Sequence, residues 1–224
     1  MARPTVLVFD VNETLSDLSP MGRSFEEVGA PPPLAKLWFA SLLRDGFALT
    51  AAAASEPFSR ISEGALRTVL AGVELTRSED EAVEHVLEDF SQLRLHRDVA
   101  DGVRDLGRAG YRLVTLSNGA TTLAERLLDE GGVRGEFEHL LSVEDAGTWK
   151  PAAAAYEYAA SVAGVDVTEL LLVAAHPWDT DGAARAGASS AWVNRSGGPY
   201  PGHFTAPRLT VSSIQELPEA LARL

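Results

Sequence analysis

The chain contains no cysteine, so disulfide bonds and thiolate metal sites are excluded. Lysine is also nearly absent, because only Lys36 and Lys150 stand against 17 arginines. Long apolar runs are missing, and residues 1–4 lead into a strand rather than into the apolar region of a signal peptide. These absences predict a soluble, cytoplasmic protein with no membrane partner.

Positive charge is scarce over the whole sequence. The formal net charge is −13 and the isoelectric point is near 4.8. Nucleic-acid partners are excluded, since phosphate binding needs basic surface and counterion release. What is present is 46% hydrophobic residues in 224, which suits one domain of ordinary core size carrying a sizeable insertion.

The most informative stretch is the apolar run over residues 5–9, which reads as a buried strand and ends at Asp10. Open α/β sheets place their chemistry at the carboxyl ends of strands, so Asp10 is the candidate nucleophile. An aspartate in that place can instead start a turn or cap a helix, and the pattern Asp-x-Asn-x-Thr alone leaves both interpretations open. Later polar groups that follow strands or open helices favour the catalytic one, at Ser117-Asn118-Gly119, Lys150-Pro151 and Asp179.

Hydrophobic periodicity divides the chain into two kinds of segment. Helical spacing dominates after Leu15, and from Arg97 onward strands alternate with helices. Alternation of this kind implies right-handed crossovers and a mostly parallel sheet. The predicted fold is α/β, with a Rossmann-like core formed by residues 1–15 and 96–224 and an inserted helical cap over residues 16–95. The expected helices are 24–28, 33–49, 57–70, 78–93, 99–109, 122–130, 152–163 and 181–186, with a terminal element over 214–224.

The ordered polar residues resemble a known family over nearly the whole length of the chain. They are similar to those of the haloacid dehalogenase superfamily, and within it the type II (S)-2-haloacid dehalogenases. The resemblance implies that Asp10 attacks the halogen-bearing carbon and that water then hydrolyses the resulting aspartyl ester. The residues that carry it are Asp10, Thr14, Ser117, Asn118, Lys150, Trp178 and Asp179.

Two positions separate the chain from the phosphatases of that superfamily. Asn12 stands where those enzymes carry an acid for the leaving group, and a departing halide needs no proton; Asn12 is also an ordinary turn residue. Ala175 stands at the first of two magnesium carboxylates, with Asp179 at the second. Neither a metal nor another cofactor is therefore expected. Lys150 would supply positive charge instead, since a cation lowers the pKa of a carboxylate such as Asp10 and attracts a substrate carboxylate.

The resemblance also implies roles for the remaining polar groups. Thr14 would hold Asp10, and Asp179 would orient Lys150 and activate the hydrolytic water. Trp178 is expected to line the pocket. The substrate carboxylate would be bound by donors at loop-to-helix junctions, namely the Ser117 hydroxyl and amides of Val11, Asn12 and Asn118.

The chain departs from the family in two places. Leu37-Trp38 is followed by Phe39, where well-known members carry a halide-binding arginine. A ring edge can contact a halide, and Arg44 could approach from farther along the same helix. His176 stands in place of an asparagine, and it could act as a base for ester hydrolysis or as a donor that shapes the pocket.

The expected substrate is a small 2-haloacid, and three other functions are kept as alternatives. Another leaving group on carbon, such as a strained-ring amino acid, is compatible with Phe39. A phosphatase is disfavoured by Asn12 and Ala175. A non-catalytic binding protein is disfavoured because the charged set is complete. A homodimer is kept open.

Overall fold

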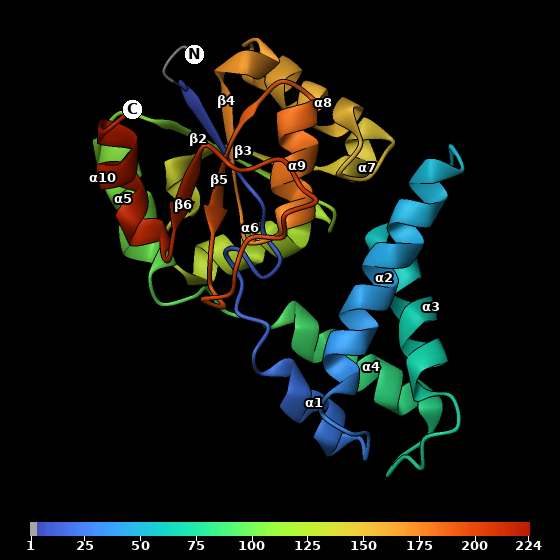
Figure 1. Ribbon diagram of the computed structural model, residues 1–224. Helices are drawn as coiled ribbons and strands as arrows, with labels where there is room; N and C mark the ends of the chain where they lie inside the picture. The colour runs from blue at the N-terminus through green and yellow to red at the C-terminus, as the bar shows by residue number, and fades with distance from the viewer. Residues whose placement is uncertain (1–3) are drawn as a thin grey trace. The chain divides into compact units, whose positions relative to one another are not determined.

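Six parallel strands form a single sheet in the computed structural model, which describes residues 4–224 (Figure 1). The order is β3-β2-β1-β4-β5-β6, so the chain runs outward from β1 first on one side and then on the other. The predicted α/β class with a mostly parallel sheet is confirmed. The strands are β1 (Val6–Phe9), β2 (Arg112–Ser117), β3 (Phe137–Ser142), β4 (Leu170–Ala174), β5 (Ser189–Val193) and β6 (Leu209–Val211).

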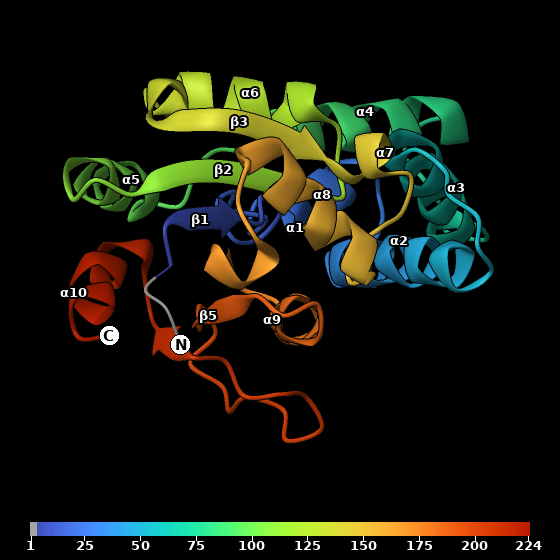
Figure 2. The same ribbon diagram turned by 90° about the horizontal axis from the view of Figure 1, so that it is seen from above.

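Helices cover both faces of the sheet, which explains why its central strands are apolar without interruption. All four residues of β1 are buried, and side chains alternate between the two faces along the strand. Leu7 and Phe9 join a core with α5 (Val99–Arg108), α6 (Thr121–Glu130) and α10 (Leu217–Ala222). Figure 2 shows α8 (Ala153–Ala163) and α9 (Pro177–Arg185) on the opposite side from α5 and α10.

The chain divides into two compact units. The core unit comprises the chain up to Ser16 and from Arg94 to Leu224, and the helical unit is Asp17–Leu93. Where the chain leaves and re-enters the core unit, Ser16 forms an antiparallel bridge with Leu95, and the His96 N–H donates to the Leu15 carbonyl at 2.9 Å. That the helical unit caps an active site of the core stays a prediction.

The helical unit has an aromatic core of its own. The Trp38 ring lies 5.4 Å from Phe90 and 6.0 Å from Phe25, measured between centroids, and Phe58 stacks on Phe90 at 5.6 Å. The Trp38 indole N–H donates to the Ser62 carbonyl at 2.9 Å, so this buried donor is satisfied. The helices are α1 (Met21–Glu27), α2 (Leu34–Ala51), α3 (Phe58–Leu70) and α4 (Glu79–Ser91).

Within residues 4–224, no helix combines the length and the apolar character that crossing a bilayer requires. The cytoplasmic location and the homodimer considered above stay predictions.

Two predicted helix starts are wrong by three residues or more, those of α1 and α9. The helix expected over 24–28 begins at Met21. The helix expected from Asp181 begins at Pro177, because proline at the first helical position has its backbone angle preset for a helix. Trp178 and Asp179 therefore lie in the first turn of α9. The helix expected over 152–163 is found at Ala153–Ala163, and the Lys150-Pro151 peptide bond before it is cis. The short helix α7 (Val143–Ala146) was not predicted.

Candidate active site

The polar residues that follow β1, β2 and β4 meet at one edge of the sheet. Asp10 follows β1 directly, and its backbone N–H donates to the carbonyl of Val173 in β4 at 3.0 Å. Ser117 ends β2, and His176 lies just beyond β4. Because these strands are adjacent and parallel, their carboxyl ends converge at the point where the strand order reverses, the usual place for a ligand.

Lys150 bridges two buried carboxylates. Its Nζ donates to Asp10 Oδ1 at 2.9 Å and to Asp179 Oδ2 at 2.6 Å, and the lysine and Asp179 are fully buried. Asp10 is only 4% exposed. An unpaired charge in such a place would be very costly, so the three groups depend on one another.

Asn118 fixes the backbone that carries Lys150. Its side-chain Oδ1 accepts the Lys150 N–H at 3.0 Å, and its Nδ2 donates to the Lys150 carbonyl at 3.4 Å. The side-chain amide of Asn118 is therefore engaged in positioning Lys150, which the sequence did not indicate. Any contribution of Asn118 to substrate binding would have to come from its backbone.

Their surroundings shift the pKa values of Asp10 and Asp179 in opposite directions. Burial alone would raise the pKa of Asp10, but the charges of Lys150 and His176 with hydrogen bonds from His176 and Thr14 hold it well below its usual range. Burial together with the neighbouring Asp10 charge raises the pKa of Asp179, although Lys150 opposes this. Burial would lower the pKa of Lys150, yet the two carboxylates raise it. Asp10 is thus kept as an anion, as a nucleophile requires.

His176 lies between two carboxylates. Its Nδ1 is 3.3 Å from Asp10 Oδ2 and its Nε2 is 2.8 Å from Glu13 Oε2. Burial would lower the pKa of His176, but hydrogen bonds and charge from Asp10 and Glu13 raise it to about 10. The Trp178 ring stacks on the imidazole at 5.1 Å and lies 6.0 Å from Lys150 Nζ. This raised pKa favours the imidazolium form of His176, and its role as a base or as a donor that shapes the pocket stays a prediction.

Thr14 connects Asp10 to the loop after β4. Its hydroxyl donates to Asp10 Oδ2 at 2.6 Å and accepts the backbone N–H of Ala175 at 2.9 Å. The Thr14 carbonyl in turn accepts from Arg195 at 2.6 Å. Ala175 thus contributes a backbone donor to this arrangement and no side-chain ligand.

The turn after β2 packs closely against the loop after β1. The Ser117 hydroxyl oxygen accepts the Gly119 N–H at 2.9 Å. A Cβ at Gly119 would stand 3.3 Å from that oxygen and 3.6 Å from Asn12 Nδ2, so this glycine permits the approach. Val11 is buried, and its carbonyl accepts the Leu15 N–H at 2.8 Å. The structure places Val11, Asn12 and Ser117 beside Asp10, and their substrate contacts stay predictions.

The sequence did not reveal Glu13 as part of this cluster. Glu13 holds His176 from a backbone with φ of 60°, in the left-handed region that non-glycine residues seldom adopt. A glutamate in a short loop does not predict a left-handed backbone, so the contact of Glu13 with His176 could not be found from the sequence.

Tyr156 was also missed, because an aromatic residue within an alanine-rich helix looks like ordinary core. Its hydroxyl donates to Asp179 Oδ1 at 2.6 Å, and burial with the Asp179 charge raises its pKa well above the usual value. Both oxygens of Asp179 are thereby hydrogen-bonded, one by Tyr156 and one by Lys150.

We expect Tyr156→Phe to lower kcat about 10-fold or more, because Asp179 loses one of its two fixed donors while the ring still fills its place. Steady-state rates and urea unfolding of both proteins check this. Tyr158→Phe, in the same helix but outside the cluster, serves as the control. Equal kcat values for Tyr156→Phe and the unmodified protein would contradict the positioning role.

Phe39 and Arg44 belong to the helical unit. Phe39 is buried in α2, and the Arg44 guanidinium pairs with Asp45 Oδ1 at 2.9 Å on an exposed surface. The halide-binding role considered for either residue stays a prediction.

Comparisons with known proteins all find dehalogenases or their family. Residues 4–187 match a family described as haloacid dehalogenase-like hydrolase. An (S)-2-haloacid dehalogenase of Pseudomonas sp. (strain YL) is 30% identical over 95% of this chain and 92% of its own. Haloacetate dehalogenase H-2 of Moraxella sp. (strain B) is 28% identical over 99% and 100%. The crystal structure of an L-2-haloacid dehalogenase superposes with a TM-score of 0.92 at 26% identity, covering 99% of this chain and 100% of that one.

Proposed function

This chain belongs to the haloacid dehalogenase-like hydrolase family, and from that premise we propose that it hydrolyses short (S)-2-haloalkanoic acids to 2-hydroxy acids without a metal. The observation that carries the proposal is the buried ion pair of Asp10 with Lys150 at the carboxyl end of β1. It presents an ionised carboxylate to the carbon of a substrate bound beside it. The relatives named above supply the substrate class.

In the first step an oxygen of Asp10 attacks the carbon that bears the halogen. The new carbon–oxygen bond forms as the carbon–halogen bond breaks, and the halide leaves with the bonding electron pair. No proton is transferred, so Asn12 can stand where a phosphatase would need an acid. Lys150 and the His176 imidazolium keep Asp10 ionised until substrate arrives.

In the second step water attacks the carboxyl carbon of the Asp10 ester. The oxyanion that develops there is stabilised by Lys150, and the bond from that carbon to the substrate oxygen breaks. The product keeps an oxygen that came from Asp10, and its configuration is inverted. Asp179 accepts a proton from the attacking water, since its raised pKa suits a base better than that of Asp10 does, and returns this proton to the departing substrate oxygen. The Asp10 carboxyl loses the second proton of the water to solvent and is again a carboxylate.

A metal at this site has too few ligands. Ala175 offers a methyl group at one carboxylate position, and Lys150 and Tyr156 already donate to the two oxygens of Asp179. Magnesium needs oxygen ligands, usually carboxylates. A methyl group and an ammonium group cannot act as such ligands, so this set of residues does not suit magnesium.

We therefore expect halide release from 2-chloro- and 2-bromopropionate to keep its full rate after exhaustive treatment with a chelator. A halide electrode follows turnover before treatment, after it, and after Mg²⁺ is added back. Loss of activity in chelator with recovery in Mg²⁺ would contradict the proposal and restore the phosphatase alternative.

A second candidate function keeps the attack of Asp10 on carbon and changes the leaving group. Phe39 favours it, because the arginine expected to receive a halide is missing at that position. A panel of 2-haloacids tested beside a strained-ring amino acid separates the two functions. Turnover of the ring substrate alone would make it the better assignment.

Glu13 is expected to set the pH range of the reaction through His176. Its carboxylate helps raise the pKa of His176 to about 10, so the imidazolium that supports Asp10 is lost only as the pH rises through that value. Glu13→Gln removes the charge, and the alkaline limb of kcat/KM should move down by about one pH unit or more. Glu13→Gly is a second variant that also relieves the left-handed backbone. If both variants keep the alkaline limb of the unmodified enzyme, Glu13 does not act through His176.

The same pair links pH to stability. The folded-state pKa of His176 lies above its unfolded value, so the stabilisation is complete below about pH 6.5 and is lost as the pH rises toward 10. Urea unfolding at pH 6.5 and 10 should therefore differ less for Glu13→Gln than for the unmodified protein.

A further inference from the structure

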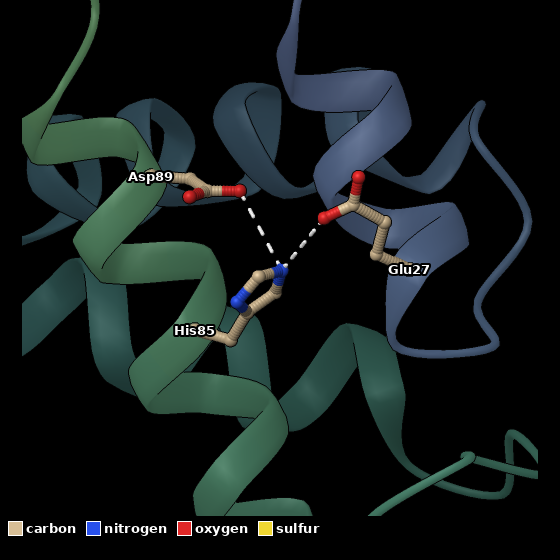
Figure 3. A group of neighbouring side chains, drawn as sticks. All are labelled: Glu27, His85 and Asp89. Carbon is tan, nitrogen blue, oxygen red and sulfur yellow. Dashed lines mark hydrogen bonds and ion pairs between the residues drawn. The ribbon is translucent and has the colours of Figure 1, made fainter.

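The helical unit contains a cluster of metal-ligating side chains that the proposed reaction does not use. Glu27 is the last residue of α1, and His85 and Asp89 come from α4 (Figure 3). His85 Nε2 lies 3.2 Å from Glu27 Oε2 and 3.6 Å from Asp89 Oδ2, and one ligand atom from each residue lies within 4.8 Å of the other two. We propose that these three side chains form a site for a divalent transition-metal ion such as Zn²⁺.

The spacing of the ligand atoms suits such an ion. Tetrahedral zinc holds nitrogen and oxygen ligands at about 2.1 Å, which puts neighbouring ligand atoms about 3.4 Å apart. The separations of His85 Nε2 from the two carboxylate oxygens, 3.2 and 3.6 Å, lie on either side of that value. The oxygens of Glu27 and Asp89 lie within 4.8 Å of each other, so they would have to approach by at most about 1.4 Å to share one ion.

Local structure brings the ligands together without strain. His85 and Asp89 are four residues apart on α4 and so share one face of the helix. Figure 3 shows the imidazole of His85 directed between the two carboxylates. Arg23 pairs with Glu27 Oε1 at 2.9 Å, which leaves Oε2 directed at His85. The ion would therefore not have to displace Arg23.

Charge and ligand type select the class of metal. One imidazole with two carboxylates favours Zn²⁺, Co²⁺ or Ni²⁺ over Mg²⁺ and Ca²⁺, which prefer oxygen ligands alone. His85 also lines a groove with Arg77, Glu81, Glu84 and Glu88, so mostly acidic side chains surround the approach. The His85 side chain is 25% exposed, which leaves room for a water as the fourth ligand. Bound there, the ion would fasten α1 to α4.

A hydrogen-bonded ion pair of His85 with Glu27 and Asp89 is the competing explanation. Such a pair needs no ion, whereas a metal site binds one and releases protons as it does so. Binding of the metal therefore distinguishes a metal site from a salt bridge.

The test is calorimetric titration of tag-free, chelator-treated full-length protein with ZnCl₂ at pH 7.5 and 5.5, with the absorption spectrum of the Co²⁺ form as a second readout. We expect one Zn²⁺ per chain, weaker binding at pH 5.5, a tetrahedral Co²⁺ spectrum and a thermal midpoint that rises with zinc. Asp89→Asn and Glu27→Gln keep the shapes of the side chains, and each should weaken binding by more than about 100-fold, beyond the usual effect of losing an outer-shell partner.

His203→Ala, at an exposed histidine of the core unit, is the matched control and should bind zinc as the unmodified protein does. The proposal is overturned if the unmodified protein binds no zinc, if both ligand variants keep its affinity, or if His203→Ala removes the binding. Because halide release is not part of these readouts, the outcome is independent of the proposed dehalogenase function.

Discussion

Asp10→Asn is expected to abolish halide release, with kcat reduced by about 10⁴-fold or more, the scale found when a catalytic nucleophile is removed. An amide has nearly the shape of a carboxylate but is a poor nucleophile. The fold should persist, because Lys150 remains paired with Asp179 at 2.6 Å after the charge of Asp10 is lost. Halide release and circular dichroism of the purified variant check both expectations.

Isotope labelling distinguishes covalent catalysis from direct attack by water. In a single turnover in H₂¹⁸O with excess enzyme, water attacks the carboxyl carbon of the ester, so the label should enter Asp10 and the product should carry unlabelled oxygen. Mass spectrometry of the peptide that contains Asp10 locates the label.

Asp181→Asn is the matched control, since Asp181 is a buried carboxylate paired with Arg185 on the same helix as Asp179 but outside the cluster. It should keep both the rate and the labelling pattern. Label in the first-turnover product would mean that water attacks the substrate, and Asp10 would no longer be the nucleophile.

The position of the cluster could be predicted from the sequence because of the geometry of parallel sheets. A polar residue after a buried strand lies at the same edge as its neighbours, so Asp10 and Ser117 could be placed together without knowledge of their distance. The scarcity of lysine singled out Lys150, and the structure shows it between Asp10 and Asp179.

What the sequence could not supply are contacts that depend on backbone conformation. The left-handed backbone at Glu13 is typical of glycine, so nothing in its identity indicates that its carboxylate turns toward His176. The side-chain contacts of Asn118 with the backbone of Lys150 could not be predicted either, because hydrogen bonds to a distant backbone leave no local sequence pattern. The start of α9 was misplaced because Pro177 can end one segment or begin the next.

Lys150→Met is expected to cause the second-largest loss. Methionine keeps the length and apolar body of lysine, but Asp10 and Asp179 then face each other buried without their shared cation. Removing one partner of a buried ion pair typically costs about 3–5 kcal/mol of stability. We expect kcat to fall by about 10³-fold or more, since both the ionised nucleophile and the stabilised oxyanion depend on Lys150.

Loss of Lys150 should also change how activity and stability depend on pH, because it changes the pKa of Asp10. In the unmodified protein the folded-state pKa of Asp10 lies below the unfolded value near 3.8, so its stabilising contribution is present above that value and is lost as the pH falls through the folded pKa. Without Lys150 the pKa of Asp10 rises, and the acid limb of the residual activity should move to higher pH. Rates and urea unfolding between pH 4 and 8 measure both effects.

Lys36→Met is the matched control, because Lys36 is the other lysine of the chain and lies exposed on α2. It should leave rate, stability and acid limb unchanged. Lys150→Arg keeps the charge, yet the planar guanidinium is too large for a fully buried position shaped around an ammonium, so it should also lose most activity. A Lys150→Met enzyme that keeps both its rate and its acid limb would show that Asp10 does not need this cation, and the ion pair would then have only a structural role.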